Sequence, residues 1–221
     1  MVEAVIFDLD GVLLDSEQLW NQAKEALVRA AGGRWRDDAP QAMMGMSSLE
    51  WSAYLRDELG VARDAADINR DVVARMEELY RTRLPLLPGA VEAVRALQDH
   101  WPLGLASSSN REIIDLALQL AGIAEAFSVT ISSEEVGQGK PAPDVYLEAC
   151  RRLGVRPERC VALEDSSNGM RAAERAGMTV IAVPNRHYPP DSDALALAAE
   201  TLPTLHQLTP SVVERSVTSA S

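Results

Sequence analysis

The chain has 221 residues, of which 47% are hydrophobic and 24% are charged, as in an ordinary globular protein that can bury a core. Its formal net charge of −12 and its sequence pI near 4.7 argue against nucleic acid and anionic membrane as main partners, because neither attracts such a surface. A small anionic substrate remains compatible with this charge, since it requires only a local positive pocket.

The first element in chain order is a short apolar run over residues 5–9, which predicts a strand. From residue 15 onward, helical periodicities follow one another with no convincing strand between them, and Gly and Pro residues separate them. We therefore predict an all-α domain over residues 15–85, called the helical insertion below. It interrupts a core domain formed by residues 1–14 and 86–221.

After the helical insertion, short apolar runs alternate with helical periodicities, which is typical of βαβ units around a parallel sheet. Short runs without polar alternation fit strands that are buried on both faces. The predicted strands in this part cover residues 103–106, 128–131, 160–163 and 179–183. The predicted fold class is α/β: a doubly wound, Rossmann-like parallel sheet with an inserted all-α domain. The small-residue segment 211–221 is expected to be loosely held.

The two cysteines, Cys150 and Cys160, lie in an apolar helix-like segment and in a strand-like segment. Neither belongs to a CxxC motif or to a cluster with histidines, so we predict buried free thiols. The N-terminus shows no charged leader followed by a long apolar stretch, and its first apolar run is too short to span a bilayer. We therefore place the protein in the cytoplasm, without membrane association. We also expect it to be a monomer or a weak homodimer.

Two carboxylates lie at the carboxyl end of the first predicted strand, in the segment Asp8-Leu9-Asp10-Gly11. Ligands of open α/β sheets bind outside the carboxyl ends of the strands. Because alternate side chains of an extended segment point to one face, Asp8 and Asp10 are expected to lie side by side. Such a pair repels itself in an apolar surrounding and implies a cation or a shared proton. A helix cap or a turn at Gly11 explains a lone pair of this kind equally well.

Polar groups also follow the next predicted strand and a later loop. Ser107 and Ser108 come after residues 103–106 and precede a helix, an arrangement that can hold phosphate through hydroxyls and backbone N–H groups. Serine is also a common helix cap. Lys140 lies in a Pro-bounded loop that could fix its charge against a phosphoryl oxygen, although a lone loop lysine is usually just solvated.

A second acidic pair, Glu164 and Asp165, follows the predicted strand over residues 160–163. The carboxyl ends of parallel strands meet at one edge of a sheet, so this pair is expected near Asp8. Carboxylates that arrive from two strands fit a hard cation such as Mg²⁺ better than zinc. The sequence therefore predicts a magnesium site at this edge.

Taken in order, these segments resemble the four motifs of the haloacid dehalogenase superfamily, in the subgroup with β-phosphoglucomutase and sugar-phosphate phosphatases. Asp8-Leu9-Asp10-Gly11-Val12 matches the first motif, Ser107 the second, Lys140 the third and Glu164-Asp165 the fourth. The motifs span nearly the whole chain. The helical insertion is similar to the small cap domain of the family, which closes over the active site and selects the substrate.

The resemblance implies an aspartyl-phosphate mechanism. Asp8 would be the nucleophile, and Asp10 the general acid and base. Mg²⁺ would be bound by Asp8, the main-chain carbonyl of Asp10 and Asp165. Glu164 would bind the metal through water or orient the lysine of the third motif. The groups that would hold the phosphoryl oxygens are Ser107, Ser108 and Lys140.

Several positions depart from the mutase branch of the family. Trp20 stands where β-phosphoglucomutase has a histidine that couples cap closure to Asp10. Ser48 aligns with its cap arginine, which grips the distal phosphate of a bisphosphate. The lysine and asparagine of its phosphate loop become Asn110 and Arg111. The acidic segment before Trp20 is similar to that of broad-specificity hexose-phosphate phosphatases, so the sequence favours a phosphatase over a mutase.

We therefore predict a Mg²⁺-dependent phosphatase that acts on a small phosphorylated metabolite, a sugar phosphate, with a β-phosphoglucomutase-type mutase as the alternative. A haloacid dehalogenase would share Asp8 but would have no use for Asp10 or a metal. A non-enzymatic phospho-accepting module would need no helical insertion. The residues of the helical insertion that are predicted to contact the substrate are Trp20, Gly45, Met46 and Ser47.

Overall fold

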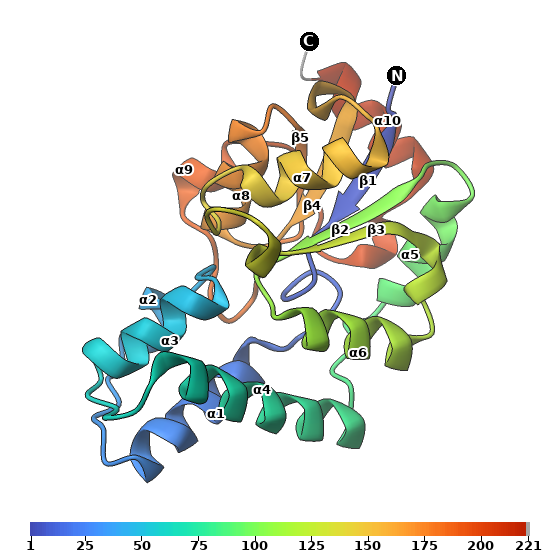
Figure 1. The fold of residues 1–221 in the computed structure, drawn as a ribbon. Helices are drawn as coiled ribbons and strands as arrows, with labels where there is room; N and C mark the ends of the chain where they lie inside the picture. The colour runs from blue at the N-terminus through green and yellow to red at the C-terminus, as the bar shows by residue number, and fades with distance from the viewer. Residues whose placement is uncertain (220–221) are drawn as a thin grey trace.

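The structure, a computed structural model, describes residues 1–219 of the chain (Figure 1). These residues form a parallel sheet of six strands in the order β3-β2-β1-β4-β5-β6. The predicted parallel sheet of an α/β fold is thus confirmed. The strands are β1 (Ala4–Phe7), β2 (Leu103–Ser107), β3 (Phe127–Ser132), β4 (Cys160–Glu164), β5 (Thr179–Ala182) and β6 (Ala198–Thr201).

The predicted strand ends agree with the observed ones to within one residue, with two exceptions. β1 ends at Phe7 and not at residue 9, because the chain turns there and the N–H groups of Leu13 and Leu14 both donate to the Leu9 carbonyl. β6 was missed, because this edge strand is only partly buried and its sequence, Ala-Ala-Glu-Thr, is no apolar run.

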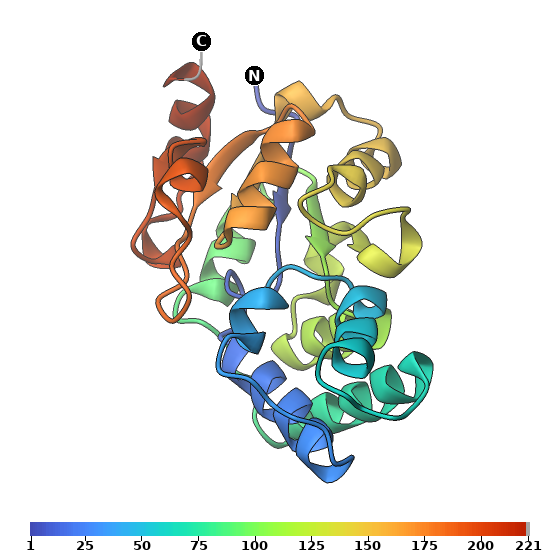
Figure 2. The same ribbon diagram turned by 90° about the vertical axis from the view of Figure 1, so that its left-hand side faces the viewer.

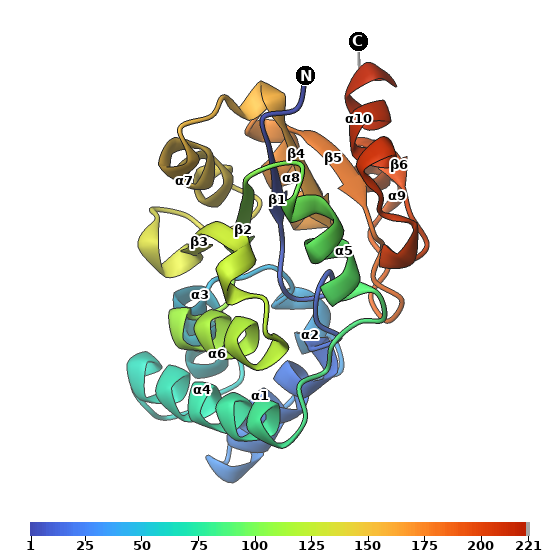
Figure 3. The ribbon, with the colours of Figure 1, turned by 90° about the vertical axis from the view of Figure 1, so that its right-hand side faces the viewer.

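Helices cover both faces of the sheet. Val5 and Phe7 of β1 belong to one buried cluster, and Ala4 and Ile6 belong to a second cluster on the opposite face, as the period of two in a strand requires. Figure 3 shows α7 on one side of the sheet and α5 with α10 on the other. Within residues 1–219, no helix has both the length and the apolar character needed to cross a membrane. The helices of the first face are α5 (Ala90–Gln98), α6 (Arg111–Ala121) and α10 (Pro210–Ser219), and those of the second are α7 (Asp144–Leu153), α8 (Ser167–Arg175) and α9 (Ser192–Leu195).

The helical insertion gathers beyond one end of the strands, at the opposite end of the molecule from both termini (Figures 1 and 2). Both α1 and α3 contact the long helix α4. The start of α3 is fixed by a capping box, in which Ser47 and Glu50 each accept from the backbone N–H of the other. Asp64 caps α4 by accepting from the Ala66 N–H. The helices are α1 (Glu17–Ala30), α2 (Ala39–Ala42), α3 (Ser48–Asp57) and α4 (Ala65–Thr82).

The two connections of the helical insertion lie side by side. Leu14 pairs with Leu86 in an isolated antiparallel bridge, and the Asp15 N–H donates to the Pro85 carbonyl over 2.8 Å. Leu14 also forms a bridge with Asp10. The chain therefore leaves and re-enters the α/β part at adjacent points, next to an acidic residue of the first motif.

The prediction of a loosely held tail from residue 211 was wrong for the described residues. They belong to α10, which packs against β5 and β6. Thr209 Oγ1 accepts from the Val212 N–H over 3.4 Å at the start of this helix, and Val213 and Ser216 are fully buried. Residues 220–221 of the predicted tail lie outside the described residues.

The two cysteines lie against each other on the face of the sheet that α7 covers. Cys150 belongs to α7 and Cys160 begins β4, and their Sγ atoms are 3.8 Å apart. Both are buried free thiols, as predicted. They lie at the opposite end of β4 from Glu164 and take no part in its acidic cluster.

Candidate active site

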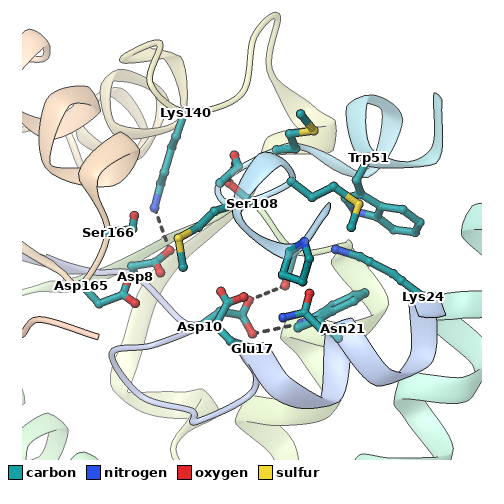
Figure 4. Close-up of a pocket in the computed structure, with 17 residues that line it drawn as sticks. Asp8, Asp10, Glu17, Asn21, Lys24, Trp51, Ser108, Lys140, Asp165 and Ser166 are labelled. Atoms are coloured by element: carbon teal, nitrogen blue, oxygen red, sulfur yellow. Dashed lines mark hydrogen bonds and ion pairs between the residues drawn. The ribbon is translucent and has the colours of Figure 1, made fainter. Parts of the chain in front are cut away.

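A pocket lies where the residues after β1, β2 and β4 face the helical insertion (Figure 4). Polar residues that follow buried parallel strands meet at one edge of the sheet, so their side chains line one wall. The second wall belongs to the helical insertion. The lining residues are Asp8, Asp10, Ser108, Ser109, Lys140, Asp165 and Ser166 from the α/β part, with Glu17, Trp20, Asn21, Lys24, Pro40, Met43, Met44, Gly45, Met46 and Trp51 from the helical insertion.

Asp8 and Lys140 form a buried ion pair in this pocket. The Lys140 ammonium donates to Asp8 Oδ1 over 2.7 Å, to Glu164 Oε1 over 2.6 Å and to the Ala106 carbonyl over 3.1 Å. An ammonium has three protons, so all of its donors are used. The side chains of Lys140 and Asp8 are 3% and 9% exposed. The lysine is therefore fixed beside the predicted nucleophile and is not the solvated side chain of an ordinary loop.

Glu164 contacts Lys140 outside the pocket and does not line it. Its Oε1 atom accepts from Lys140 and, over 2.6 Å, from the Tyr146 hydroxyl, while Oε2 accepts from the Ser166 hydroxyl over 3.3 Å. Gly169 leaves the space that this carboxylate fills, because a Cβ atom there would lie 1.9 Å from Oε2. These contacts support the orientation of Lys140 as the role of Glu164.

Asp165 lies against the turn that follows β1. A Cβ atom on Gly11 would lie 1.8 Å from Asp165 Oδ2, so glycine, with φ of +84°, leaves room for the carboxylate. Asn185 Nδ2 donates to the same oxygen over 2.9 Å. Asn185 Oδ1 in turn accepts from the N–H groups of His187 and Tyr188. Sequence reasoning missed Asn185, because it lies in a loop after β5 and belongs to no motif.

Three buried carboxylates converge at this edge of the sheet. Oxygen atoms of Asp8, Glu164 and Asp165 all lie within 4.8 Å of one another. The cluster offers only oxygen donors, which suit a hard divalent cation. The side chain of Asp10 lies outside the cluster. If Asp10 contacts a metal, as predicted, it would do so through its main-chain carbonyl.

The charges of this cluster are not balanced by Lys140 alone. Burial raises the pKa of Asp8 to about 8, with Glu164 and Asp10 adding to the rise and Lys140 opposing it. Burial also raises the pKa of Asp165 well above its usual range, and Glu164 and Asp8 add to this shift. For Lys140 burial opposes the charged form, but Asp8 and Glu164 outweigh it and raise the pKa. A bound cation would favour the ionised form of both aspartates.

Asp10 is held by donors from both walls of the pocket. Trp20 Nε1 donates to Asp10 Oδ1 over 3.2 Å, and the Ser16 hydroxyl donates to the same oxygen. The Ser109 hydroxyl donates to Asp10 Oδ2. Hydrogen bonds to a carboxylate are strong and directional, so this side chain has a fixed orientation toward the pocket.

The serines after β2 have three different positions. Ser107 is fully buried and does not line the pocket; its Oγ atom accepts from the Ser109 N–H over 3.0 Å. Ser108 lines the pocket and donates to the Gly45 carbonyl over 3.2 Å. Ser109 lines it as well and contacts Asp10. Sequence reasoning missed the contact of Ser109 with Asp10, because a serine after a strand also fits an ordinary helix cap.

Three of the four predicted contact residues of the helical insertion line the pocket. They are Trp20, Gly45 and Met46, whereas Ser47 does not line it. The Ser47 hydroxyl instead donates to Glu50 Oε2 over 2.7 Å within the capping box of α3.

Apart from Trp20, the residues that depart from the mutase branch are Ser48, Asn110 and Arg111. Their side chains form contacts outside the pocket. Ser48 and Asn110 both donate to Glu134 Oε1, over 2.8 and 2.7 Å. Arg111 donates to Thr130 Oγ1 over 2.7 Å, on the neighbouring strand β3. None of these three residues lines the pocket.

Sequence reasoning also missed Asn21, Lys24 and Trp51, which line the wall of the helical insertion. Two signals in the sequence could have found Lys24. It follows Trp20 by four positions, which places both side chains on one face of a helix. Lys24 and Lys140 are also the only lysines in the sequence, and both line this pocket.

Comparison with known proteins identifies the family. A family model for haloacid dehalogenase-like hydrolases matches residues 2–177. Hexitol phosphatase B of Escherichia coli (strain K12) is 35% identical over 184 residues, which cover 82% of this chain and 83% of that protein. A mutant of CbbY from Rhodobacter sphaeroides, in complex with xylulose-(1,5)bisphosphate, is similar with a TM-score of 0.85 at 30% identity, covering 96% of this chain and 99% of the other. The β-phosphoglucomutase of Clostridium difficile shares the fold, with a TM-score of 0.87 at 22% identity over 100% and 99% of the two chains. As its four motifs predict, the chain belongs to the haloacid dehalogenase-like hydrolases.

Proposed function

We propose that the chain is a Mg²⁺-dependent phosphatase that hydrolyses a sugar phosphate through an aspartyl-phosphate intermediate on Asp8. The observation that carries the proposal is the buried contact between Asp8 and Lys140 beside the carboxylate of Asp165. Phosphoryl transfer needs a nucleophile, a fixed positive charge for the phosphoryl oxygens and compensation for the anions that meet there. The name of the relative hexitol phosphatase B supports a phosphorylated sugar or polyol as the substrate.

In the first step, an oxygen of Asp8 attacks phosphorus, and the bond from phosphorus to the leaving oxygen breaks. Asp10 gives its proton to that oxygen, so the product leaves as a neutral alcohol. In the second step, Asp10 takes a proton from water as the water oxygen attacks the aspartyl phosphate. The bond from phosphorus to Asp8 breaks, which releases phosphate and restores both carboxyl groups. The three donors on Asp10 keep it in place for both proton transfers.

The residues that would hold Mg²⁺ are Asp8, Asp165 and the main-chain carbonyl of Asp10. Their oxygen donors and the space beside Gly11 fit such an ion. When bound, Mg²⁺ would neutralise the carboxylates and polarise the phosphoryl group. Asn185 would orient the Asp165 carboxylate through its hydrogen bond.

We propose that the phosphoryl oxygens are bound by Lys140, by Ser108 and by the loop whose backbone Ser107 fixes. Lys140 already contacts the nucleophile, and Ser108 lines the pocket. Ser107 fixes the backbone of the same loop through its contact with the Ser109 N–H. Positioning and charge stabilisation of this kind supply most of the catalysis in phosphoryl transfer.

We further propose that residues 15–85 act as a cap that selects the alcohol part of the substrate. Most residues that line the pocket come from this segment. Its two connections lie side by side at Leu14 and Leu86, so a small change there would move the segment as one body.

A phosphate-release assay tests the proposed function. The protein is incubated with Mg²⁺ and a panel of sugar and nucleoside monophosphates, and free phosphate is measured. Asp8→Asn should bring release to background while the circular dichroism spectrum stays unchanged, since an amide cannot attack phosphorus and the substitution is nearly isosteric. The control is Asp99→Asn, an exposed aspartate outside the pocket. Release by Asp8→Asn near the wild-type rate would overturn the assignment.

A further inference from the structure

Lys24 places a second cation in the pocket, on the wall of the helical insertion (Figure 4). Its Nζ atom lies 5.3 Å from the ring centroid of Trp20 and 4.8 Å from that of Trp51. The two rings belong to α1 and α3, and their centroids are 6.1 Å apart. The lysine is only 7% exposed. The ammonium is thus held between two indole faces at the border of the pocket.

Within residues 1–219 this ammonium forms no hydrogen bond or ion pair; it contacts the two rings, and the charges of Glu17 and Asp10 act on it from beyond ion-pair distance. Lys140, the other lysine, has an acceptor for each of its protons. A buried ammonium without acceptors is unfavourable, and the attraction of aromatic faces offsets only part of that cost. The free donors of Lys24 therefore remain available to a molecule that enters the pocket.

The pKa shifts of Lys24 and Glu17 also indicate that the charge of the lysine is not fully balanced within the pocket. Burial lowers the pKa of Lys24 to about 8, although the negative charges of Glu17 and Asp10 oppose the shift. Burial and the charge of Asp10 raise the pKa of Glu17 to about 7, so this carboxylate does not fully balance the lysine. An anion that reaches Lys24 would stabilise the charged form of the ammonium.

Lys24 and Lys140 enter the pocket from different sides (Figure 4). Lys140 contacts Asp8, where the proposed function places the phosphoryl group. The alcohol part of the substrate must then extend toward the helical insertion, where Lys24 lies. A group on that alcohol, remote from the reacting phosphate, is therefore the part that Lys24 can reach.

We propose, building on the proposed phosphatase function, that Lys24 is a specificity residue that binds a second anionic group at the far end of the leaving alcohol. The substrate class is then a phosphorylated sugar acid or a sugar bisphosphate. A neutral sugar hydroxyl could accept a hydrogen bond from Lys24, but it would leave the buried charge unbalanced. A charge-assisted bond to a carboxylate or a phosphate is stronger.

Three matched hexose derivatives separate these chemistries. Glucose 6-phosphate has a neutral far end, 6-phosphogluconate has a carboxylate there, and glucose 1,6-bisphosphate has a second phosphate. For the wild-type protein with Mg²⁺, we expect kcat/KM for one of the two doubly anionic substrates to exceed that for glucose 6-phosphate by about tenfold or more. The doubly anionic substrate with the higher kcat/KM shows whether Lys24 binds a carboxylate or a phosphate.

Variants at Lys24 connect this preference to the residue. Lys24→Met keeps the length of the side chain and should remove the preference, chiefly through a higher KM for the doubly anionic substrate. Lys24→Arg keeps the charge and should retain part of the preference. Arg29→Met is the matched control, because Arg29 is an exposed cation on the same helix and does not line the pocket. It should leave the preference unchanged.

Binding without turnover gives a second measurement. The affinity of the preferred substrate for Asp8→Asn is measured by calorimetry, with and without Lys24→Met, and a loss of about tenfold is expected. Equal kcat/KM for the three compounds, or a preference or affinity that persists in Lys24→Met, would overturn the role of Lys24. Failure of the proposed function has a different signature, namely no Asp8-dependent phosphate release from any compound.

Discussion

The indole N–H of Trp20 donates to Asp10 Oδ1 over 3.2 Å, and this bond joins the helical insertion to the proposed general acid and base. The sequence placed Trp20 where the mutase branch has a histidine that couples closure to this acid. The structure shows that the contact with Asp10 is still present, in another chemical form. An indole nitrogen donates but does not titrate, so the donor of this bond, unlike a histidine, keeps its proton throughout the physiological pH range.

Trp20→Phe keeps an aromatic ring, removes the N–H donor and shortens the ring that faces Lys24 and Trp51. We expect kcat to fall about five- to tenfold with KM nearly unchanged, as for the loss of one of several hydrogen bonds that orient a catalytic carboxylate. Steady-state kinetics on the best substrate of the panel measure this change. Trp101→Phe, outside the pocket, serves as the control. A rise in KM alone would show that Trp20 contacts the substrate and does not orient Asp10.

Gly169→Ala tests whether Glu164 positions the lysine of the third motif. The added Cβ atom would lie 1.9 Å from Glu164 Oε2, so the carboxylate must move and release Lys140. We expect kcat to fall by about a hundredfold or more and the free energy of unfolding to fall by about 1 to 3 kcal/mol, because a buried ion pair is disturbed. The matched control is Glu174→Ala, an exposed position on the same helix. Wild-type kcat in Gly169→Ala would contradict the positioning role.

Magnesium should stabilise the folded protein through Asp8 and Asp165. At a concentration of one hundred times Kd, a single bound ion adds about 2.7 kcal/mol to the free energy of unfolding. Because burial raises the pKa of Asp8 to about 8, protons compete with the ion below that pH, and the rise in Tm should shrink as the pH falls. Thermal melts with and without Mg²⁺ at several pH values measure this.

Asp165→Asn and Asp99→Asn complete the metal experiment. Asp165→Asn should lose most of the Mg²⁺-dependent rise in Tm, while the exposed Asp99→Asn should keep it. Full phosphatase activity in excess chelator, or an unchanged rise in Tm for Asp165→Asn, would contradict a metal held at this cluster.

The sequence alone predicted the sheet and the main acidic residues because these depend on local patterns. The strand that precedes Asp8 is an uninterrupted apolar run, and such runs have few alternatives to a buried strand. Its exact end was not predictable, since the turn after Phe7 depends on carbonyl contacts of Leu9. β6 has no apolar pattern, because an edge strand needs less burial.

The rest of the pocket depends on contacts between segments that are distant in the sequence. Asn185 reaches Asp165 across 20 positions, and Ser109 reaches Asp10 across 99. Neither residue differs in type from an ordinary turn or cap residue. Ser47 was predicted to contact the substrate, but it does not line the pocket, and its sequence context also fits the capping box that it forms.

Lys24→Met should stabilise the protein in the absence of substrate. Burial lowers the pKa of Lys24 from 10.5 to about 8, so below pH 8 the folded state carries a charge that the unfolded chain solvates better. Between these values the unfolded chain binds more protons, and wild-type stability rises with pH through this residue. At pH 7 the variant should therefore be more stable by about 1 to 3 kcal/mol, a difference that vanishes above about pH 10.5.

Urea unfolding of both proteins across this pH range measures the difference, with Arg29→Met again as the control. Lower stability of Lys24→Met at pH 7 would show that the two indole rings fully compensate the buried charge. That result would leave the lysine as a structural part of the helical insertion.

The last prediction concerns the phosphoryl group on Asp8 after its transfer. A mutase must keep this ester while an intermediate reorients and rebinds through its other phosphate, which needs a cationic grip and control over water. At the positions of the mutase branch, Ser48 and Asn110 instead donate to Glu134, and Arg111 contacts Thr130. Ser109 holds Asp10 in place, so we expect Asp10 to activate water at once.

Incubation with β-glucose 1-phosphate and a trace of its bisphosphate should therefore yield free phosphate and little glucose 6-phosphate. Both products are quantified in the same reaction, by phosphate release and by a coupled dehydrogenase assay. Conversion to glucose 6-phosphate well above phosphate release would overturn the prediction and make the mutase the correct function. The same reaction with Lys24→Met then tests whether Lys24 binds the distal phosphate, because Lys24 is the cation of the helical insertion that lines the pocket. A mutase that depends on Lys24 would lose glucose 6-phosphate formation in this variant and keep the release of phosphate.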